Sequence, residues 1–261
     1  MLIDTHCHLN NDTLYKIRKD IIKEANDVNV KLFIVPGYDL KTSKLAIKLA
    51  EEFENVYAAV GFHPTEIKEY SDKEYEWLED ACKHSKVVAI GEIGYDFHWD
   101  TTTPEEQEVS FKRQIEIAKR VGKPLIIHSR DAMKKTFDTL LETNAFSIGG
   151  VMHSYSGSVE MAKEFVKRGF YLGIGGPVTF LNAKDPKAVV NEIDLKHIIT
   201  ETDSPYLTPH PYRGKMNSPK YIPLIAEKIM ELKQIDYDTL QKQVMENVKN
   251  LFNIEVENEE N

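Results

Sequence analysis

The chain has 261 residues, of which 41% are hydrophobic and 29% charged, a composition ordinary for a soluble globular protein. A net charge of −9 argues against broad duplex binding through a basic face, although a small local phosphate site stays possible. No apolar stretch is long enough to cross a bilayer and no signal peptide is expected, so we predict no membrane association. The two cysteines make no disulfide framework and indicate a reducing, cytoplasmic setting.

Short β-branched runs alternate with longer segments of helical periodicity along the chain. Strands are predicted over 2–6, 31–35, 56–61, 87–91, 124–128, 148–153, 170–174 and 197–202. Helices are predicted near 10–27, 41–53, 72–84, 104–121, 131–143, 158–168 and 184–193, with two more near 219–232 and 237–250. The alternation predicts an α/β protein with a parallel sheet.

Eight strand–helix units favour closure into a (βα)8 TIM barrel, one domain over 1–254 with an additional C-terminal helix. A doubly wound open sheet is the competitor, but no glycine-rich dinucleotide turn follows the first predicted strand. The residues 255–261 form an acidic C-terminal tail.

Six side chains of the metal-ligand type stand where the strand-like runs end. They are His6, His8, Glu92, His128, His153 and Asp203. Taken singly, each has an ordinary interpretation as a capping, ion-paired or turn residue. In a barrel, however, the carboxyl ends of the strands build the active site, so we predict that the six converge on one metal site.

The ligand types indicate which metals such a site holds. Side chains alternate along a strand, so His6 and His8 share a face while Cys7 points away as a packed thiol. Imidazole mixed with carboxylate suits Zn²⁺, Mn²⁺, Co²⁺ or Fe²⁺, and Mg²⁺ fits a carboxylate-rich half. Six ligands exceed the need of one tetrahedral zinc, which favours two divalent ions (Mg²⁺, Mn²⁺, Zn²⁺ or Co²⁺) bridged by Glu92.

Six motifs surround these side chains: Asp4-Thr-His-Cys-His8, Gly61-Phe-His-Pro64, Gly91-Glu-Ile-Gly-Tyr-Asp96, His128-Ser-Arg130, His153-Ser-Tyr-Ser-Gly157 and Glu201-Thr-Asp-Ser-Pro205. With these motifs the chain resembles the TatD family of metal-dependent deoxyribonucleases, which belongs to the amidohydrolase superfamily of TIM barrels. The resemblance covers nearly the whole chain. It implies hydrolysis of DNA phosphodiester bonds, commonly as a 3′–5′ exonuclease, two divalent metals, and metal binding by the six side chains named above.

For the reaction, we expect metal-activated water to attack phosphorus, with Asp203 accepting its proton and Glu92 holding the metal spacing. His63 is predicted to donate to a phosphate oxygen or to the leaving group, with a loop-positioning role as the alternative. Arg130 shares the strand parity of His128 and either binds phosphate or pairs with Glu201.

The remaining candidates lie around the metals. Asp4 and Glu201 share strand parity with His6 and Asp203 and are expected to support ligands from behind. Tyr206 and Arg213 belong to a loop whose rings and cations suit a single-stranded end. The weak candidates are the predicted loop residues Asp96 and Tyr155.

Two other functions stay open at this point. One is hydrolysis of a small ester, lactone or amide by the same superfamily, several members of which bridge their metals with a carboxylated lysine where Glu92 stands here. The other is a non-catalytic interaction protein. We expect DNA, as single-stranded ends, to be the partner and the chain to be a monomer.

Overall fold

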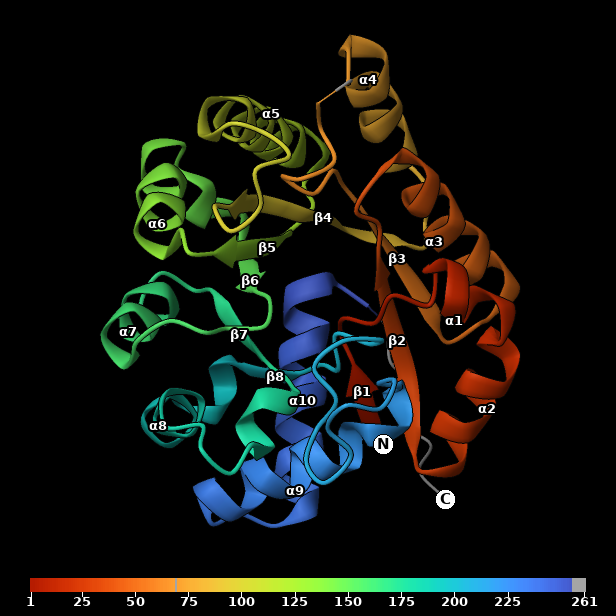
Figure 1. Ribbon diagram of the computed structural model, residues 1–261, viewed down its shortest axis with the longest axis vertical. Helices are drawn as coiled ribbons and strands as arrows, with labels where there is room; N and C mark the ends of the chain where they lie inside the picture. The colour runs from red at the N-terminus through yellow and green to blue at the C-terminus, as the bar shows by residue number, and fades with distance from the viewer. Residues whose placement is uncertain (69, 255–261) are drawn as a thin grey trace.

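The computed structural model describes residues 1–68 and 70–254. Eight parallel strands, hydrogen-bonded in sequence order, form a nearly closed barrel surrounded by helices (Figure 1). The strands are β1 (Leu2–Asp4), β2 (Val30–Pro36), β3 (Val56–Val60), β4 (Val87–Asp96), β5 (Leu125–Arg130), β6 (Gly150–Met152), β7 (Tyr171–Ile174) and β8 (Ile198–Thr200). All eight predicted strands are present, which confirms the (βα)8 barrel. The predicted acidic tail lies outside the described residues.

The helices cover the outside of the barrel (Figure 1). They are α1 (Asp12–Lys16), α2 (Arg18–Asp27), α3 (Leu40–Glu52), α4 (Asp72–Ala81), α5 (Pro104–Val121), α6 (Met133–Glu142), α7 (Val159–Val166), α8 (Asp185–Glu192), α9 (Ile222–Lys233) and α10 (Tyr237–Phe252). Short 3₁₀ turns are η1 (Ala145–Ile148), η2 (Gly176–Thr179), η3 (Leu195–His197) and η4 (Pro219–Tyr221). Among the described residues, no helix is both long enough and apolar enough to span a membrane.

The single helix predicted over 10–27 is wrong, because the chain forms two helices there. Ile17 leaves the helical region at φ −115° and ψ 18°, which ends α1 and lets α2 start in a new direction. The sequence gives little indication of this break, since Ile17 is neither glycine nor proline and only its backbone angles show where α1 ends.

Helix α5 illustrates how local sequence sets the element ends. The Thr103 hydroxyl accepts a hydrogen bond from the Glu106 N–H, and the Glu106 carboxylate accepts one from the Thr103 N–H. Pro104 occupies the first turn, where its missing N–H costs nothing. Gly122 ends the helix at φ +65°, a conformation that glycine adopts without strain. The chain then returns directly into β5.

Strand β4 runs farther than predicted, to Asp96 instead of Gly91, and every one of its residues is buried. The extension continues the ladder with β5, in which Gly94 faces His128. Gly94 is required there, because a Cβ would lie 2.0 Å from the His128 carbonyl oxygen and its φ is +143°. Glu92 and Asp96 are therefore residues of one strand with the same side-chain parity.

The barrel closes at a seam between β8 and β1, where hydrogen bonds extend past both strands. The Thr5 N–H donates to the Thr200 carbonyl at 3.0 Å. Farther along, the Asp203 N–H donates to the His6 carbonyl at 2.8 Å, and the His8 N–H donates to the Ser204 carbonyl at 2.8 Å. The backbone that carries three predicted ligands is thus fixed by the seam itself.

Asp4 is the side chain that fastens this seam. Its fully buried carboxyl group accepts hydrogen bonds at Oδ1 from the Thr202 N–H at 2.9 Å and the His6 N–H at 3.2 Å. Oδ2 accepts from the Thr202 hydroxyl at 2.6 Å. Asp4 therefore positions the backbone of His6. The sequence predicted that Asp4 supports a metal ligand but did not indicate which contact does so.

Two helices follow the last strand, as predicted. Helix α10 packs against β1 and β8, beside which it lies in Figure 1. Its Asn247 amide donates to the carbonyls of Leu195 and Ile198 at 2.8 and 2.7 Å. The additional C-terminal helix thus supports the seam from outside the barrel.

Replacing Asp4 by alanine is expected to lower the free energy of unfolding by roughly 2–4 kcal/mol, because three buried donors lose their acceptor. Asp4→Asn keeps an oxygen for both backbone N–H groups and is expected to be milder. Urea unfolding followed by circular dichroism compares the two variants with the parent chain. An alanine variant with the parent's midpoint would show that this carboxyl group does not hold the seam.

Candidate metal centre

The six predicted ligand residues meet at one end of the barrel. Four of them follow the ends of β1, β6 and β8: His6, His8, His153 and Asp203. Glu92 and His128 lie inside β4 and β5, so the prediction that each ends its strand is wrong. The error does not move them away from the cluster, because both strands continue past the site instead of stopping short of it.

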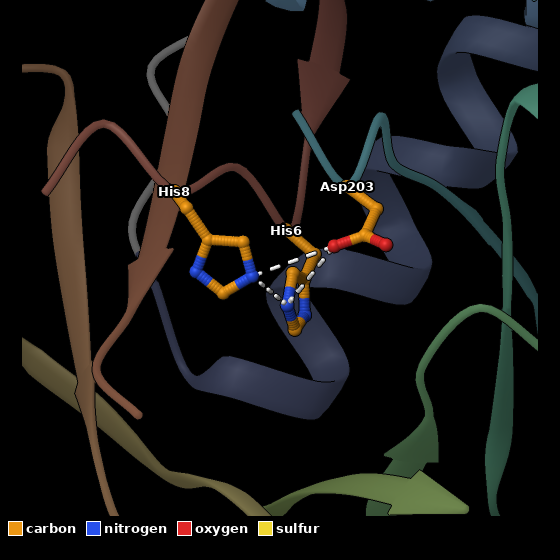
Figure 2. A group of neighbouring side chains, drawn as sticks. All are labelled: His6, His8 and Asp203. Carbon is orange, nitrogen blue, oxygen red and sulfur yellow. Dashed lines mark hydrogen bonds and ion pairs between the residues drawn. The ribbon is translucent and has the colours of Figure 1, made fainter. Parts of the chain in front are cut away.

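Three of these side chains point toward one another in Figure 2: His6, His8 and Asp203. The Nε2 atoms of His6 and His8 are 3.3 Å apart, and they lie 4.0 and 3.4 Å from Asp203 Oδ1. Glu92 completes the set, with its Oε2 at 3.4 Å from His6 Nε2 and 3.7 Å from His8 Nε2. We call these four residues the first group.

The first group fits a divalent cation. Ligands about 2.0–2.1 Å from a tetrahedral metal lie about 3.3 Å from one another. The two Nε2 atoms are 3.3 Å apart, and they lie 3.4–4.0 Å from Asp203 Oδ1 and from Glu92 Oε2. The Nε2 atoms of His6 and His8 face each other, and both face the carboxylates of Glu92 and Asp203. Hydrogen bonds among these groups alone do not pair all of these buried atoms. They are the donor set of Zn²⁺, Mn²⁺, Co²⁺ or Fe²⁺.

A second group surrounds the other oxygen of Glu92. Its Oε1 lies 2.8 Å from His128 Nδ1, 3.6 Å from His153 Nε2 and 3.8 Å from His63 Nε2. Glu92 is only 4% exposed, so neither oxygen is turned to bulk water. One carboxylate therefore faces two sets of imidazoles, one with each oxygen.

Glu201 holds His153 from behind. Its Oε1 lies 3.1 Å from His153 Nδ1, an ion-pair distance without regular hydrogen-bond alignment, and accepts a hydrogen bond from the Ser154 N–H. A carboxylate behind a metal-binding imidazole fixes the ring and raises its basicity. Gly173 in β7 makes room, since a Cβ there would lie 2.2 Å from Glu201 Oε2.

Buried opposite charges change the proton affinities of the cluster. Burial raises the pKa of Glu92, but His153 and His128 outweigh burial and hold that pKa well below its usual value. Burial lowers the pKa of His153, but Glu201 and Glu92 outweigh it and raise that pKa to about 10. The carboxylates thus draw positive charge into the cluster, which is the electrostatic demand that a metal ion meets.

Asp96 was predicted as a weak site candidate in a loop, but it lies within the metal cluster. It belongs to β4 and not to a loop, is 2% exposed, and has its Oδ2 2.9 Å from His128 Nε2. Burial opposes its charge, yet the bond to His128 holds the pKa of Asp96 below its ordinary value. The signal was its spacing of four residues from Glu92, which gives the same strand parity once β4 is extended.

His63 lies at the entrance of the second group, with 14% of its side chain exposed. Its Nδ1 is 2.7 Å from the Thr65 hydroxyl and 3.3 Å from the Thr65 N–H. Burial and the neighbouring His128 lower the pKa of His63 to about 3. The imidazole is therefore neutral and presents Nε2 to the cluster.

Arg130 lies at the outer end of β5, where it is exposed. Its guanidinium carbon is 5.8 Å from the ring centre of Trp99. Glu201 is turned to His153 and Ser154 instead, so the alternative in which Arg130 pairs with Glu201 is not what the structure has.

The loop after β8 brings Tyr206 beside the first group, with its ring centre 6.3 Å from that of His8. Arg213 stacks its guanidinium on Phe180, 4.0 Å from the ring centre. Tyr155, the other weak candidate, is buried and donates its hydroxyl to the Ser158 carbonyl, so it serves the loop after β6. Cys7 is a buried thiol facing the Ile34 carbonyl, as predicted.

Comparison with known proteins gives a consistent picture. Residues 3–253 match the family model of the TatD related DNases. The uncharacterized metal-dependent hydrolase YabD of Bacillus subtilis (strain 168) is 43% identical over 254 residues, which cover 97% of this chain and 100% of the relative. An uncharacterized metal-dependent hydrolase TatD of Mycobacterium tuberculosis (strain ATCC 25618 / H37Rv) is 33% identical over 242 residues, covering 88% and 90% of the two chains.

Solved structures agree with this comparison. The crystal structure of YjjV, a TatD homolog from Escherichia coli K12, superposes with a TM-score of 0.92 at 31% identity, covering 97% of this chain and 98% of the other. A TatD family hydrolase from Entamoeba histolytica superposes with a TM-score of 0.84 at 20% identity, over 96% and 97% of the chains. The second likeness concerns the fold alone.

Gly173→Ala is expected to weaken metal binding by about 10- to 100-fold, because the added methyl group displaces the Glu201 carboxylate from His153. Isothermal titration with Zn²⁺ or Mn²⁺ measures the change. Gly175→Ala is the matched control, since its Cβ would lie 3.4 Å from the Glu201 carbonyl oxygen, an ordinary contact. Equal affinities of the two variants, with equal melting curves, would contradict a supporting role for Glu201.

Proposed function

This chain belongs to the TatD-related DNase family of metal-dependent hydrolases, and from that premise we propose that it hydrolyses DNA phosphodiester bonds with two divalent metal ions. We propose the 3′ ends of single strands as its substrate. The net charge of −9 supports a local phosphate site over a broad duplex-binding face. The free, buried Cys7 and Cys82 fit a reducing cytoplasm, where we propose that the chain acts as a monomer.

The observation that carries the proposal is the position of Glu92 between two groups of imidazoles. Its Oε2 lies within 3.7 Å of His6 and His8, whereas its Oε1 lies within 3.6 Å of His128 and His153. A carboxylate placed in this way serves as a bridge between two cations. In the proposal His6, His8 and Asp203 hold one ion, and His128 and His153 hold the other.

When bound, two divalent cations activate water as a nucleophile near neutral pH and neutralise charge on the phosphate and the leaving oxygen. Asp203 accepts the proton of the attacking water. This role is supported by its geometry, since Oδ1 faces the imidazoles while the other carboxylate oxygen points away from His6 and His8 (Figure 2). The water oxygen bonds to phosphorus, and the bond from phosphorus to the 3′ oxygen of the remaining strand breaks. That oxygen takes a proton from solvent.

His63 is proposed as a hydrogen-bond donor to a phosphate oxygen. Its Nδ1 lies 3.3 Å from the Thr65 N–H and 2.7 Å from the Thr65 hydroxyl, and in the proposal Nδ1 accepts from that N–H, so that Nε2 carries the ring proton. That nitrogen lies 3.8 Å from Glu92 Oε1, at the edge of the second group. Arg130 and Arg213 are proposed to meet the phosphates next to the reacting one, which charged side chains at the rim reach without burial.

A second reaction class is hydrolysis of a small ester, lactone or amide, and the third possibility is an interaction protein without activity. An assay with defined substrates distinguishes both from the main proposal, because each predicts a different set of cleaved substrates. Neither has a specific feature of the described residues in its favour, because all six candidate ligands are present and β4 has Glu92 and no lysine.

Glu92→Gln is expected to reduce the metal content from two equivalents to one or none, because an amide cannot bridge two cations. Plasma mass spectrometry after gel filtration in trace-metal-free buffer counts the ions. Glu227→Gln, at an exposed position of α9, controls for the loss of a carboxylate elsewhere. Two equivalents retained by Glu92→Gln would rule out the bridge.

Asp203→Asn is expected to lower turnover of single-stranded DNA by at least about 10³-fold while the fold persists, because the proton acceptor and a metal-binding charge are lost together. The parent and the variant are purified identically and incubated with a 30-mer carrying either a 3′ or a 5′ label. Mg²⁺, Mn²⁺ and Zn²⁺ are tested, each beside EDTA.

Early release of the 3′ label as a mononucleotide, with a ladder from the 5′ label, supports the proposed polarity. Equal cleavage by the Asp203→Asn variant would contradict the role of Asp203 as proton acceptor. An intact oligonucleotide under every metal, beside a cleaved ester or lactone, would replace the main proposal by the second reaction class.

A further inference from the structure

Two exposed aromatic rings stand on the connections that follow β4 and β8, each three residues beyond an aspartate of the metal cluster. Trp99 is three residues beyond Asp96 and is 54% exposed. Tyr206 is three residues beyond Asp203 and is 56% exposed. Single exposed apolar residues are common, so what matters for these two rings is their place next to residues of the metal cluster.

The two rings lie on different sides of the metal cluster. They follow β4 and β8, which are half a turn apart in a barrel whose strands are ordered from β1 to β8. In Figure 1 the yellow loop after β4 and the light blue loop after β8 lie on different sides of the barrel. Trp99 is linked to the second group through Asp96 and His128, whereas Tyr206 contacts His8 of the first group.

The cluster is partly exposed at some of its side chains and closed at others. His128 and Asp203 have 17% and 14% of their side chains exposed, whereas the side chains of His6 and His153 have 1% and 4%. His63, at the edge of the second group, is 14% exposed as well, so a substrate reaches the cluster over His63, His128 and Asp203. Trp99 is on the connection after β4, the strand paired with β5 and its His128, and Tyr206 is three residues beyond Asp203.

Cationic side chains lie beside Trp99 and within the loop that carries Tyr206. The Arg130 guanidinium carbon lies 5.8 Å from the Trp99 ring centre. In the loop of Tyr206, Arg213 stacks on Phe180 and the Lys215 ammonium lies 5.4 Å from the ring centre of Tyr212. In a chain with a net charge of −9, aromatic rings next to cations on both sides of a metal site are complementary to a strand of alternating phosphates and bases.

We propose that Trp99 and Tyr206 are base-stacking platforms that hold unpaired nucleobases on either side of the reacting phosphate. The inference rests on the proposed nuclease function and narrows its substrate to an unpaired end with at least two intact bases. Paired bases already stack within the duplex and do not offer their faces to both rings. The site therefore distinguishes frayed or single-stranded ends from blunt ones without reading sequence.

The two tryptophans of the chain make the Trp99 platform directly observable. Trp77 lies in α4, partly buried, with the Lys44 ammonium 5.4 Å from its ring centre. Trp77→Phe leaves Trp99 as the only tryptophan. Combined with Asp203→Asn to prevent hydrolysis, this variant is titrated with hexathymidylate in saturating Mg²⁺ and its tryptophan fluorescence is followed.

We expect saturable quenching of Trp99 by hexathymidylate, and loss of that quenching when an abasic residue occupies the position that stacks on the ring. Replacing Trp99 by leucine is expected to weaken binding roughly tenfold, whereas phenylalanine restores most of it. The same contrast is expected for Tyr206→Leu and Tyr206→Phe, with fluorescence anisotropy of a labelled oligonucleotide as the readout.

An abasic scan along the oligonucleotide separates the two platforms. In the parent chain, an abasic residue at a stacking position is expected to lower the binding affinity. Trp99→Leu is expected to abolish this loss at one position of the oligonucleotide, and Tyr206→Leu is expected to abolish it at a different position. A double-mutant cycle between protein and oligonucleotide measures both effects. A merely structural role for either ring would weaken binding equally at all positions. Equal binding of intact and abasic strands, by a parent chain that still cleaves DNA, would overturn the stacking inference alone. A parent that neither binds nor cleaves DNA would overturn the proposed function and, with it, this inference.

Discussion

Concentrated negative charge in a site largely withdrawn from water is the constraint on which this structure depends. The carboxyl groups of Glu92, Asp96 and Glu201 are all nearly inaccessible and lie against imidazoles at one mouth of the barrel. Removing a carboxylate from water is costly unless it is paired and hydrogen-bonded. The cluster persists because hydrogen-bonded strands fix its backbone and because each carboxylate has an imidazole partner. A bound divalent cation would meet the same demand for positive charge that raises the pKa of His153.

The same residues close the barrel and form the candidate metal site. The seam between β8 and β1 uses the backbone of His6, His8 and Asp203, the same residues whose side chains form most of the first group. Asp4 fastens the seam two residues before His6. A shift of β8 against β1 would therefore separate two imidazoles from a carboxylate, which is why a rigid closure is needed where few strand hydrogen bonds are available.

Sequence patterns were sufficient for the barrel and for the convergence of the six candidate ligands. Strand alternation told which neighbours of a ligand face inward, so Glu201 was expected beside the site and Cys7 away from it. The predictions were wrong where a strand continued past glycines or where a helix ended without a glycine or proline. Glycines at 91 and 94 disguised the outer half of β4, so Asp96 was assigned to a loop. The break at Ile17 left no mark at all. Exposed rings such as Trp99 were invisible to a method that reads periodicity, because exposure depends on packing from other elements.

The first group combines residues far apart in the sequence, since among the described residues His6 and His8 precede the first helix and Asp203 follows the last strand. During synthesis on the ribosome, a polypeptide that has not yet released β8 lacks one side of that group. It therefore has no complete cation cage, however well its earlier strands have folded. During translation, the first group is therefore complete only after Asp203 has been synthesised and β8 has joined the barrel.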